Sequence, residues 1–360
     1  MRIIPVSRLS RRPMGLGLLF LLICLFGAGT ALGQQQESMS QRPVAAPQGS
    51  GDIGSDYWRA LRQGESGYSA SAPGRQSDLI NVSGSAWMTQ RNEEVTKIGA
   101  WAFAIFAGAV LLFYLARGTV RVDKGRSGRV VERWPLAHRI IHWWVAVLFI
   151  IQLFSGLVIL YGKSLLIPLL GKETFGVLAQ LAKTTHNYLG PLLFVGMVVM
   201  IVAWLKHNIP KGVDFSWFAK GGGLVGKGHP SAGYLNGGEK AWFWLVATVG
   251  GLIVVTGMVL DFPQFGQTRE TMQSMNYLHG VAGLIVGAMT IAHIYIATLG
   301  TEGAMEGMLN GYVDVNWAEQ HHDLWYEEVK DQAIDAESLQ QEGGSSGSTV
   351  GGDQPSSSPA

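Results

Sequence analysis

Residues 277–297 read YLHGVAGLIVGAMTIAHIYIA. The stretch contains no Asp, Glu, Lys or Arg, as expected for a helix in contact with lipid, yet it carries two histidines, His279 and His293. At a rise of about 1.5 Å and a turn of about 100° per residue, fourteen residues separate them by about 21 Å and return them to within about 40° of one face. The stretch therefore predicts a membrane helix that presents an imidazole at each of two depths.

The composition of the whole chain agrees with a membrane protein. Only 15% of its 360 residues are charged, and the apolar residues are concentrated in a few long runs, whereas an ordinary soluble domain has about 25% charged residues. The net charge is +1, and no cluster of Lys and Arg is interleaved with aromatic residues as a nucleic-acid-binding surface requires. The composition therefore gives no indication of nucleic-acid binding.

The N-terminal region predicts a secreted, weakly structured segment. Residues 1–33 combine four arginines, an apolar run and a small-residue site, which is typical of a cleavable signal peptide; an uncleaved first transmembrane helix is the alternative. The only cysteine, Cys24, would leave with the signal, which excludes disulfides, thiolate-bound clusters and c-type haem attachment in the mature chain. Residues 34–96, rich in Gly, Ser, Gln and Pro, predict a periplasmic segment with little structure.

Five further stretches are long enough to cross the roughly 30 Å hydrocarbon core, which takes about 20 helical residues. They are Ile98 to Ala116, Ile140 to Gly162, Thr184 to Leu205, Ala241 to Leu260, and Thr271 to Thr301. Because an unpaired backbone polar group is costly in lipid, all five should be helices. The sequence therefore predicts an all-α membrane protein.

Basic residues predict how the spans are oriented. Lys and Arg are abundant in the loops 117–139 and 206–240 and sparse in the loops 163–183 and 261–270. Since cytoplasmic loops carry the excess of basic residues, we expect a protein of the bacterial inner membrane with a periplasmic mature N-terminus and a cytoplasmic C-terminus. Residues 331–360 end in a Gly- and Ser-rich run, which predicts a low-complexity cytoplasmic tail.

Four histidines lie within the predicted spans, and the topology assigns them in pairs. His186 and His279 fall near the outer surface, whereas His142 and His293 fall near the cytoplasmic surface. Two imidazoles from different helices are the usual axial ligands of a b-type haem in a helix bundle. A histidine in a membrane bundle is also often only an interhelical hydrogen bond, but four histidines without another ionisable partner in the spans favour a common role.

Zinc is the competing metal, because HRIIH at 138–142 places two histidines one helical turn apart. However, Arg139 stands where a zincin motif has Glu, and structural zinc usually recruits thiolates. Small residues near the histidines either admit a flat macrocycle or allow close helix packing. They are Gly156, Gly190, Gly257, Gly280, Gly283 and Gly287.

The chain from about Arg133 to Val329 resembles the gamma subunit of membrane-bound formate dehydrogenase, a dihaem cytochrome b. The resemblance rests on a set of blocks in the same order and spacing: HRIIHWW, THNYLG, KHNIP, NGGEKAWFW, LHGVAG, IAHIYIA and WAEQHHDLWYEE. It implies a four-helix transmembrane cytochrome b bundle over 118–330, with the span at 97–117 as an additional N-terminal helix. Residues 1–130 lie outside the resemblance and inherit no function from it.

The resemblance also implies cofactors and partners. His142 and His293 would hold the iron of the cytoplasmic-side haem b, and His186 and His279 that of the periplasmic-side haem. A catalytic subunit with molybdenum or tungsten and an iron–sulfur subunit would lie on the outer face and deliver electrons from formate, and the heterotrimers would assemble further. This chain itself would carry no formate-oxidising site.

The family reduces quinone near the inner haem, at an Asn-x-Gly-Gln run and the haem ligand. Asn236, Gly238 and His293 carry over, whereas Glu239 stands in place of the Gln. A carboxylate there either accepts a hydrogen bond from a quinol or is simply an acid favoured at a helix start. Three cationic residues are candidates to neutralise haem propionates, although they also fit the positive-inside pattern: Arg133, Arg139 and Lys240.

Two alternatives stay open from the sequence. Cytochrome b subunits of nickel–iron hydrogenases and thiosulfate reductases share the bundle with related histidines. A proton-coupled transporter belongs to a different class, but such proteins normally add carboxylates inside the membrane, and the predicted spans around these histidines contain none.

Overall fold

The structure, a computed structural model, describes residues 62–63, 87–224 and 228–339. The predicted signal sequence, most of the segment 34–96 and the end of the tail lie outside the described residues. Five of the described helices are long and apolar enough to cross a membrane, which confirms the five predicted spans of a multi-pass, helical membrane protein: Trp87–Arg117, Leu136–Leu165, Ile167–Asn208, Gly237–Asp261 and Arg269–Gly300.

The spans are built from the longer helices, and shorter elements follow or connect them. The spanning elements are η4 (Gln90–Ile98) with α4 (Gly99–Arg117), α5 (Leu136–Leu165), α6 (Ile167–Trp204) with η5 (Leu205–Asn208), α8 (Gly237–Leu245) with η7 (Val246–Gly250) and α9 (Gly251–Asp261), and α10 (Arg269–Tyr295) with η9 (Ile296–Gly300). The other elements are β1 (Arg129–Glu132), α7 (Gly212–Ala219), η6 (Gly221–Gly223), η8 (Pro263–Phe265), α11 (Glu306–Asn310), β2 (Tyr312–Asp314), α12 (Val315–His321), α13 (Asp323–Val329), η10 (Lys330–Gln332) and β3 (Ile334–Asp335).

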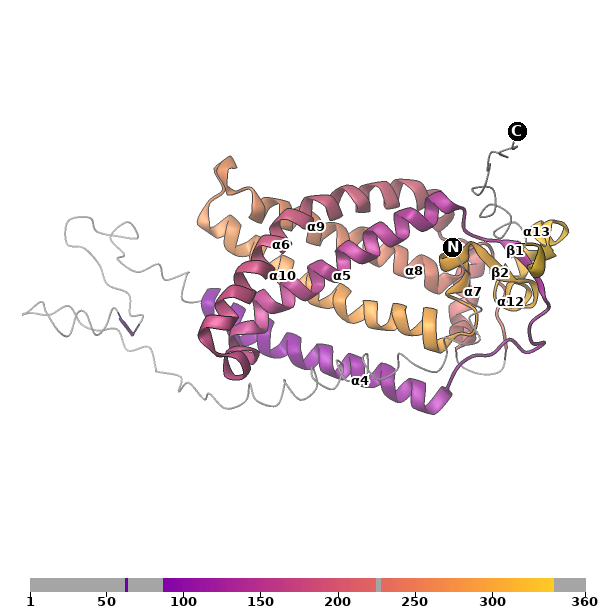
Figure 1. The fold of residues 1–360 in the computed structure, drawn as a ribbon, viewed down its shortest axis with the longest axis horizontal. Coiled ribbons are helices and arrows are strands. Elements are labelled where there is room, and N and C mark those ends of the chain that lie inside the picture. Colours follow the sequence, from indigo (N-terminus) through magenta and orange to yellow (C-terminus); the bar gives the residue numbers. More distant parts are fainter. Residues whose placement is uncertain (1–61, 64–86, 225–227, 340–360) are drawn as a thin grey trace, which may run out of the picture.

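Four spans form a bundle, and the fifth lies against one side of it (Figure 1). α5 packs along α6, α9 packs along α10, and α6 joins the two hairpins by contacting α9. α4, the additional span, contacts α10 and runs along the outside of the bundle. Because side chains facing lipid gain little from one another, such helices associate through close packing and interhelical hydrogen bonds.

Glycines explain how α4 approaches α10 so closely. A Cβ at Gly99 would clash with Leu284 of α10, and a Cβ at Gly280 would lie 3.5 Å from Cγ1 of Val95. A Cβ at Gly287 would lie 2.7 Å from Leu153 Cδ1 of α5. Gly99 and Gly287 therefore serve close helix packing, whereas the contact at Gly280 has an ordinary van der Waals distance.

All five spans begin before the residue that the sequence predicts, and the difference is largest for the first and third spans. The first helix starts at Trp87, inside the segment expected to be weakly structured, because Trp87 Nε1 donates to Gln273 O and Val95 is buried against α10. α6 begins at Ile167, so the expected outer loop is largely helical. A kink at Gly171, whose φ of 76° suits glycine, lets the chain turn from α5 into this extended helix.

A small cap closes one end of the bundle, and we define it as β1–β3 with α11–α13. Its antiparallel sheet has the order β2-β1-β3, with Val131 opposite Val313 and Val130 opposite Ile334. The all-α prediction missed this sheet. Because β3 is Ile334–Asp335, the folded region extends past residue 330, where the sequence predicts that the tail begins.

The connection from the additional span is bonded to the cap and to the end of α10. Val120 N donates to Gly300 O, and Glu302 N donates to Val120 O. Arg126 Nη1 donates to Glu306 Oε2 at 2.7 Å. The segment after α4 is thereby tied to the residues that follow α10, although it lies outside the resemblance.

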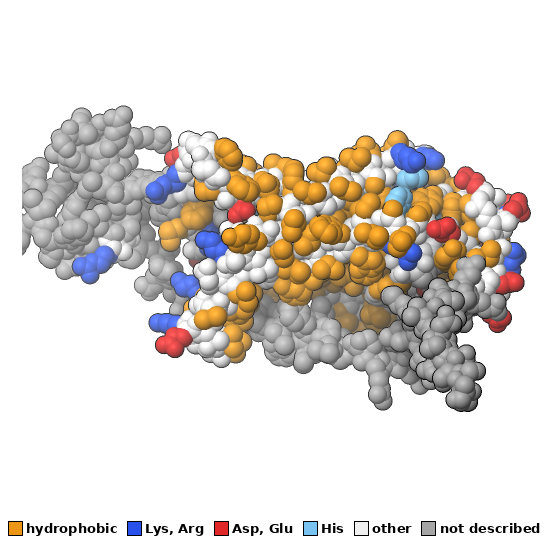
Figure 2. Space-filling view, turned by 45° about the horizontal axis from the view of Figure 1, so that its top comes forward, with side chains coloured by type: hydrophobic (Ala, Val, Ile, Leu, Met, Phe, Trp, Pro, Cys, Tyr) orange, Lys and Arg blue, Asp and Glu red, His pale blue; other side chains and the backbone are white. Residues whose placement is uncertain are grey.

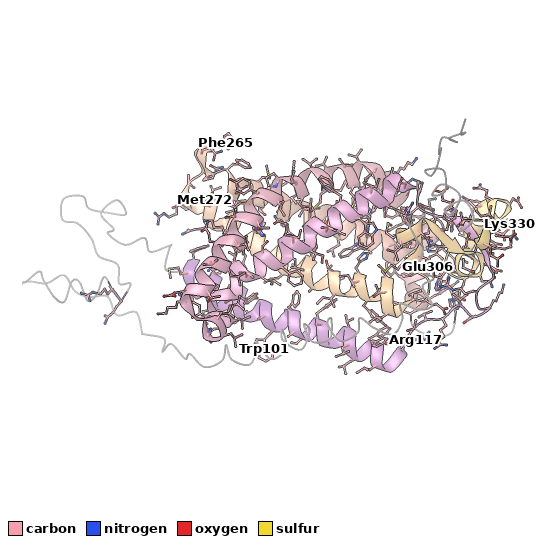
Figure 3. All side chains as sticks on the ribbon, in the orientation of Figure 1. Trp101, Arg117, Phe265, Met272, Glu306 and Lys330 are labelled. Carbon is pink, nitrogen blue, oxygen red and sulfur yellow. The ribbon has the colours of Figure 1, made fainter. Side chains whose placement is uncertain are left out.

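Apolar and charged side chains lie in different parts of the molecular surface along its long axis. Figure 2 shows hydrophobic side chains over the middle of the visible face and charged side chains toward its two ends. Arg117 and Glu306 lie near the cap, whereas Phe265 and Met272 lie at the opposite end (Figure 3). We call these the cap end and the far end.

Candidate functional site

The four intramembrane histidines meet in two pairs. His142 on α5 faces His293 on α10, with ring centres 6.4 Å apart and ring planes at 50°. His186 on α6 faces His279 on α10, with ring centres 5.9 Å apart and planes at 81°. The structure therefore brings together the same partners that the topology predicts. The first pair lies toward the cap end, where α5 begins and α10 ends.

The spacing within each pair matches two imidazoles that share one metal. Two metal–nitrogen bonds of about 2 Å each, plus about 1 Å from each ring nitrogen to its ring centre, place opposed imidazoles about 6 Å apart. The described part of the chain contains no group of three or more His, Cys, Asp or Glu suited to a metal. A structural zinc site needs four ligands, so pairs of imidazoles fit a haem, whose ring supplies the other four.

The far-end pair has its outward ring nitrogens already engaged. Ser155 Oγ lies 2.9 Å from Nδ1 of His186, and the carbonyl oxygen of Ile253 lies 3.0 Å from Nδ1 of His279. A carbonyl only accepts, so Nδ1 of His279 carries the proton and Nε2 keeps its lone pair. A neutral imidazole with a free Nε2 lone pair is the form that binds iron.

The cap-end pair lies between two tryptophans. The His293 ring stacks on Trp242 at 4.7 Å and 11°, and the His142 ring lies 6.4 Å from Trp204 at 22°. Nδ1 of His142 and Nε1 of Trp204 are buried and have no hydrogen-bond partner among the described residues. A buried polar atom without a partner is uncommon. A haem iron would bind one ring nitrogen of His142, and a haem propionate would supply an acceptor for the Trp204 N–H, so the residues present fit the cofactor.

Asn236 and Glu239, both predicted to contact quinone, close the start of α8. Asn236 Oδ1 accepts from Glu239 N at 2.9 Å, and Glu239 Oε2 accepts from Asn236 N at 2.9 Å. This is a capping box. Gly238 packs against Trp217, since a Cβ there would lie 2.9 Å from that ring. Trp242, which stacks on His293, follows Glu239 on α8 by less than one helical turn, so this helix start lies close to the cap-end histidine pair. The assignment of quinone to these residues stays a prediction.

The three cationic residues predicted to neutralise haem propionates already have hydrogen-bond or ion-pair partners in the protein. Lys240 Nζ and Asp214 Oδ2 form a buried pair at 2.8 Å, and Arg139 Nη1 donates to Leu309 O. Arg133 Nη2 donates to Glu239 Oε1 at 2.9 Å, and its Nη1 has no partner among the described residues. Carboxylates of the protein therefore already balance the charges of Lys240 and Arg133.

Arg133 also ties the bundle to the cap through aromatic rings. Its guanidinium carbon lies within 6 Å of the centres of four of them, and Arg133 is 3% exposed. Cations are attracted to aromatic faces, more strongly when desolvated. The four rings belong to Trp134, Tyr234, Trp317 and Trp325.

His322 is a buried residue that the sequence analysis missed. His322 is 1% exposed, and Trp317 and Trp325, which flank it in the sequence, are core residues of the cap. His322 Nδ1 donates to Gly233 O at 2.9 Å, and its Nε2 lies 3.9 Å from Glu239 Oε2. The adjacent pair of histidines in EQHHDLW was the available signal.

Sequence comparison identifies the group to which this chain belongs. Residues 133–311 match the family described as prokaryotic cytochrome b561. The chain belongs to that family. Membership of a cytochrome b family implies haem b, as the donor set of the paired histidines does.

Two similar proteins are cytochrome b subunits of formate dehydrogenases. The nitrate-inducible formate dehydrogenase cytochrome b556(Fdn) subunit of Escherichia coli strain K12 is 32% identical over 212 residues, covering 57% of this chain and 94% of that protein. The formate dehydrogenase cytochrome b556 subunit of Haemophilus influenzae is 28% identical over 236 residues, covering 64% of this chain and 95% of the relative. This bears out the resemblance found from the sequence blocks.

His321 and His322 should make the folded protein less stable in acid, because the protein environment lowers the pKa of both. Burial and then Arg133 lower the pKa of His322 well below its usual 6.5, and burial followed by His229 lowers the pKa of His321 to about 4. Both stay neutral in the folded state but gain protons on unfolding. Their contribution to the free energy of unfolding is therefore fully present above pH 6.5 and is lost as the pH falls from 6.5 to about 4. Each group contributes a slope of at most about 1.4 kcal/mol per pH unit.

Thermal unfolding of the detergent-purified protein between pH 7.5 and pH 5 measures this loss. His322→Asn keeps a donor toward Gly233 O but cannot titrate, so its melting temperature should depend less on pH than that of the wild type. An identical pH dependence in both proteins would contradict the role of His322.

Proposed function

We propose that this chain is the membrane cytochrome b subunit of a formate dehydrogenase complex, which passes electrons from a periplasmic iron–sulfur subunit through two b haems to quinone near the cytoplasmic face. The observation that carries the proposal is the pair of imidazole sites, each with ring centres about 6 Å apart, on one shared helix. The family and the names of the relatives support the choice of complex.

In this proposal His142 and His293 hold one haem, and His186 and His279 hold the other. Each haem b, when bound, supplies a one-electron couple, which the chain itself lacks. The task of the protein is to fix the ligands and their separation. His279 and His293 lie on the unbroken helix α10, which sets their Cα atoms about 21 Å apart along its axis.

The cap end is assigned to the cytoplasm and the far end to the periplasm. Basic side chains concentrate in the segment that joins α4 to the cap, as the positive-inside rule expects of a cytoplasmic loop: Arg117, Arg121, Lys124, Arg126 and Arg129. The far end then receives the iron–sulfur subunit, and the catalytic subunit with molybdenum or tungsten lies beyond it. In this arrangement the bacterial inner membrane is crossed five times by the mature chain, and heterotrimers assemble further.

Quinone is assigned to the cap end, beside His293, with Asn236, Gly238 and Glu239. The side chain of Glu239 is 38% exposed while Arg133 holds one of its oxygens, so a charged carboxylate is available to water. Trp242 links this helix start to His293 by direct stacking. Glu239 is thereby suited to exchange protons with the cytoplasm close to the inner imidazole pair.

Other members of this structural class remain the second candidate. Cytochrome b subunits of nickel–iron hydrogenases and thiosulfate reductases use related bundles, and the name of the matched family does not separate them. The relatives named formate dehydrogenase subunits favour formate. A proton-coupled transporter is disfavoured because each intramembrane histidine faces another histidine at ligand spacing.

Spectra of histidine variants test the assignment of the haems. We expect the reduced-minus-oxidised spectrum of the purified protein to show b-type haem at two per chain. His279→Ala should lose the far-end haem and His293→Ala the cap-end haem, because each variant removes one axial ligand. A haem content far from two, or loss of the same haem in both variants, would sink the two-level assignment.

Two substitutions of Glu239 separate its structural and chemical roles. Glu239→Gln removes the charge but keeps one oxygen for the Asn236 backbone N–H, so both haems should be retained while quinone reduction slows. Glu239→Ala removes both oxygens, so the Asn236 N–H and the buried Arg133 cation lose every contact with this side chain, and the melting temperature should fall further than in Glu239→Gln. Unchanged kinetics in Glu239→Gln, measured with a water-soluble quinone analogue, would reduce Glu239 to a helix cap.

A further inference from the structure

Each far-end histidine rests against a matching set of three residues on the preceding helix. On α5 the set is Gln152, Ser155 and Gly156, and on α9 it is Ile253, Thr256 and Gly257. The offsets within the two sets are identical, with a hydroxyl three residues and a glycine four residues after the first member. We call these sets the α5 seat and the α9 seat.

The α5 seat contacts His186 at three points. Ser155 Oγ lies 2.9 Å from His186 Nδ1 and donates its own proton to Gln152 O at 3.1 Å. Gln152 Nε2 donates to the backbone carbonyl of His186 at 2.8 Å. A Cβ at Gly156 would lie 3.2 Å from His186 Cε1, so the ring rests on the glycine. Because the hydroxyl proton is directed at Gln152 O, Ser155 accepts from Nδ1.

The α9 seat contacts His279 through the corresponding hydroxyl and glycine, whereas its first member, Ile253, acts through its backbone carbonyl. Thr256 Oγ1 donates to Leu252 O at 2.6 Å and lies 3.2 Å from His279 Nδ1. The carbonyl oxygen of Ile253 also accepts from Nδ1, at 3.0 Å. A Cβ at Gly257 would lie 3.1 Å from His279 Cε1. Nδ1 of His279 therefore has two acceptors, one from a side chain and one from the backbone.

We propose that the two seats are positioning elements for the far-end haem, and that they act unequally on its two axial ligands. The proposal rests on the proposed function, in which His186 and His279 ligate that haem. A hydrogen bond from Nδ1 fixes the proton there, leaves Nε2 as the ligand and makes the imidazole a better electron donor. The seats thus set both the orientation of the two rings and the reduction potential of the haem that they hold.

The inequality follows from the quality of the second acceptor. Ser155 Oγ lies 2.9 Å from His186 Nδ1, and the backbone carbonyl of Gln152, which accepts the Ser155 proton, is a second and poorer partner of the same ring. Loss of the Ser155 hydroxyl leaves the buried N–H with this poorer acceptor and weakens the ligand. Loss of the Thr256 hydroxyl leaves the Ile253 carbonyl in place, so the Nδ1 proton of His279 stays satisfied. Ser155 is therefore the more sensitive positioning residue, although both seats look alike in sequence.

A redox titration of the purified holoprotein, followed by haem absorbance, tests the proposal. In Ser155→Ala the far-end haem should become easier to reduce by roughly fivefold in its ferric-to-ferrous equilibrium, which is about 40 mV at 59 mV per tenfold change. Thr256→Val should shift the same haem by less than half as much. The cap-end haem should keep its wild-type potential in both variants.

Two controls separate the hydrogen bond from packing. Ser155→Thr keeps a hydroxyl at the seat and should retain the wild-type potential. Thr290→Val removes a buried hydroxyl of α10 that donates to Val286 O and contacts neither histidine nitrogen, so it should shift neither haem. If Ser155→Ala fails to retain the far-end haem, Ser155→Cys replaces it, because a thiol is a weak acceptor and should give a smaller shift in the same direction.

The outcomes distinguish this inference from the proposed function. Two haems with an unmoved far-end potential in Ser155→Ala would overturn the inference while leaving the haem assignment standing. Equal shifts in Ser155→Ala and Thr256→Val would overturn the inequality. A wild-type protein without a second haem, or a His186→Ala variant that retains it, would instead overturn the proposed function.

Discussion

A buried neutral imidazole has one N–H and one lone pair, and in an apolar helix bundle both need a partner. This constraint organises the far end of the bundle. The N–H groups of His186 and His279 are directed at oxygen atoms of α5 and α9, which leaves the lone pair on the opposite nitrogen of each ring, and the two ring centres lie 5.9 Å apart. Glycines at 156 and 257 make this possible, because any side chain there would press on the rings.

The same helix connects the two levels. α10 runs without interruption through His279 and His293, so one rigid element supplies a histidine to each pair, while α5 and α6 each supply one of the two partner histidines. A helix has a fixed rise per residue, and the separation between the two levels is therefore built into the sequence and does not depend on loops. The additional helix α4 packs on the outside of α10 through Gly99 and contributes no histidine.

At the cap end of the bundle, buried ion pairs take the place of the hydroxyl and carbonyl contacts found at the far end. Buried charge is paired there, with Arg133 joined to Glu239 and Lys240 joined to Asp214. Both pairs fix the start of α8, whose residue Trp242 stacks on His293. The family resemblance suggests a quinone site in this region, and the structure adds that the same residues hold the helix start in place. In the proposed function these side chains would serve both quinone reduction and folding, so a substitution that keeps the hydrogen bonds at the start of α8 is needed to separate the two.

The sequence was sufficient for the spans and for the pairing of the histidines, because long apolar runs and their order in the membrane leave few arrangements. It was insufficient for contacts that depend on the relative rotation of two helices. Ser155 lies 31 residues before His186 and Thr256 lies 23 residues before His279, and nothing in the local pattern aligns them. The cap sheet was missed because β1–β3 are only two to four residues long and pair across most of the chain.

The central claim is that four histidines hold two haems at two levels of one bundle. An electron cryomicroscopy map of the haem-loaded protein, purified with its partner subunits, tests it most directly. The account predicts one haem between His142 and His293, a second between His186 and His279, and an iron–iron separation of about 20 Å. A map with a single haem, or with either iron bound to a histidine outside its assigned pair, would contradict it.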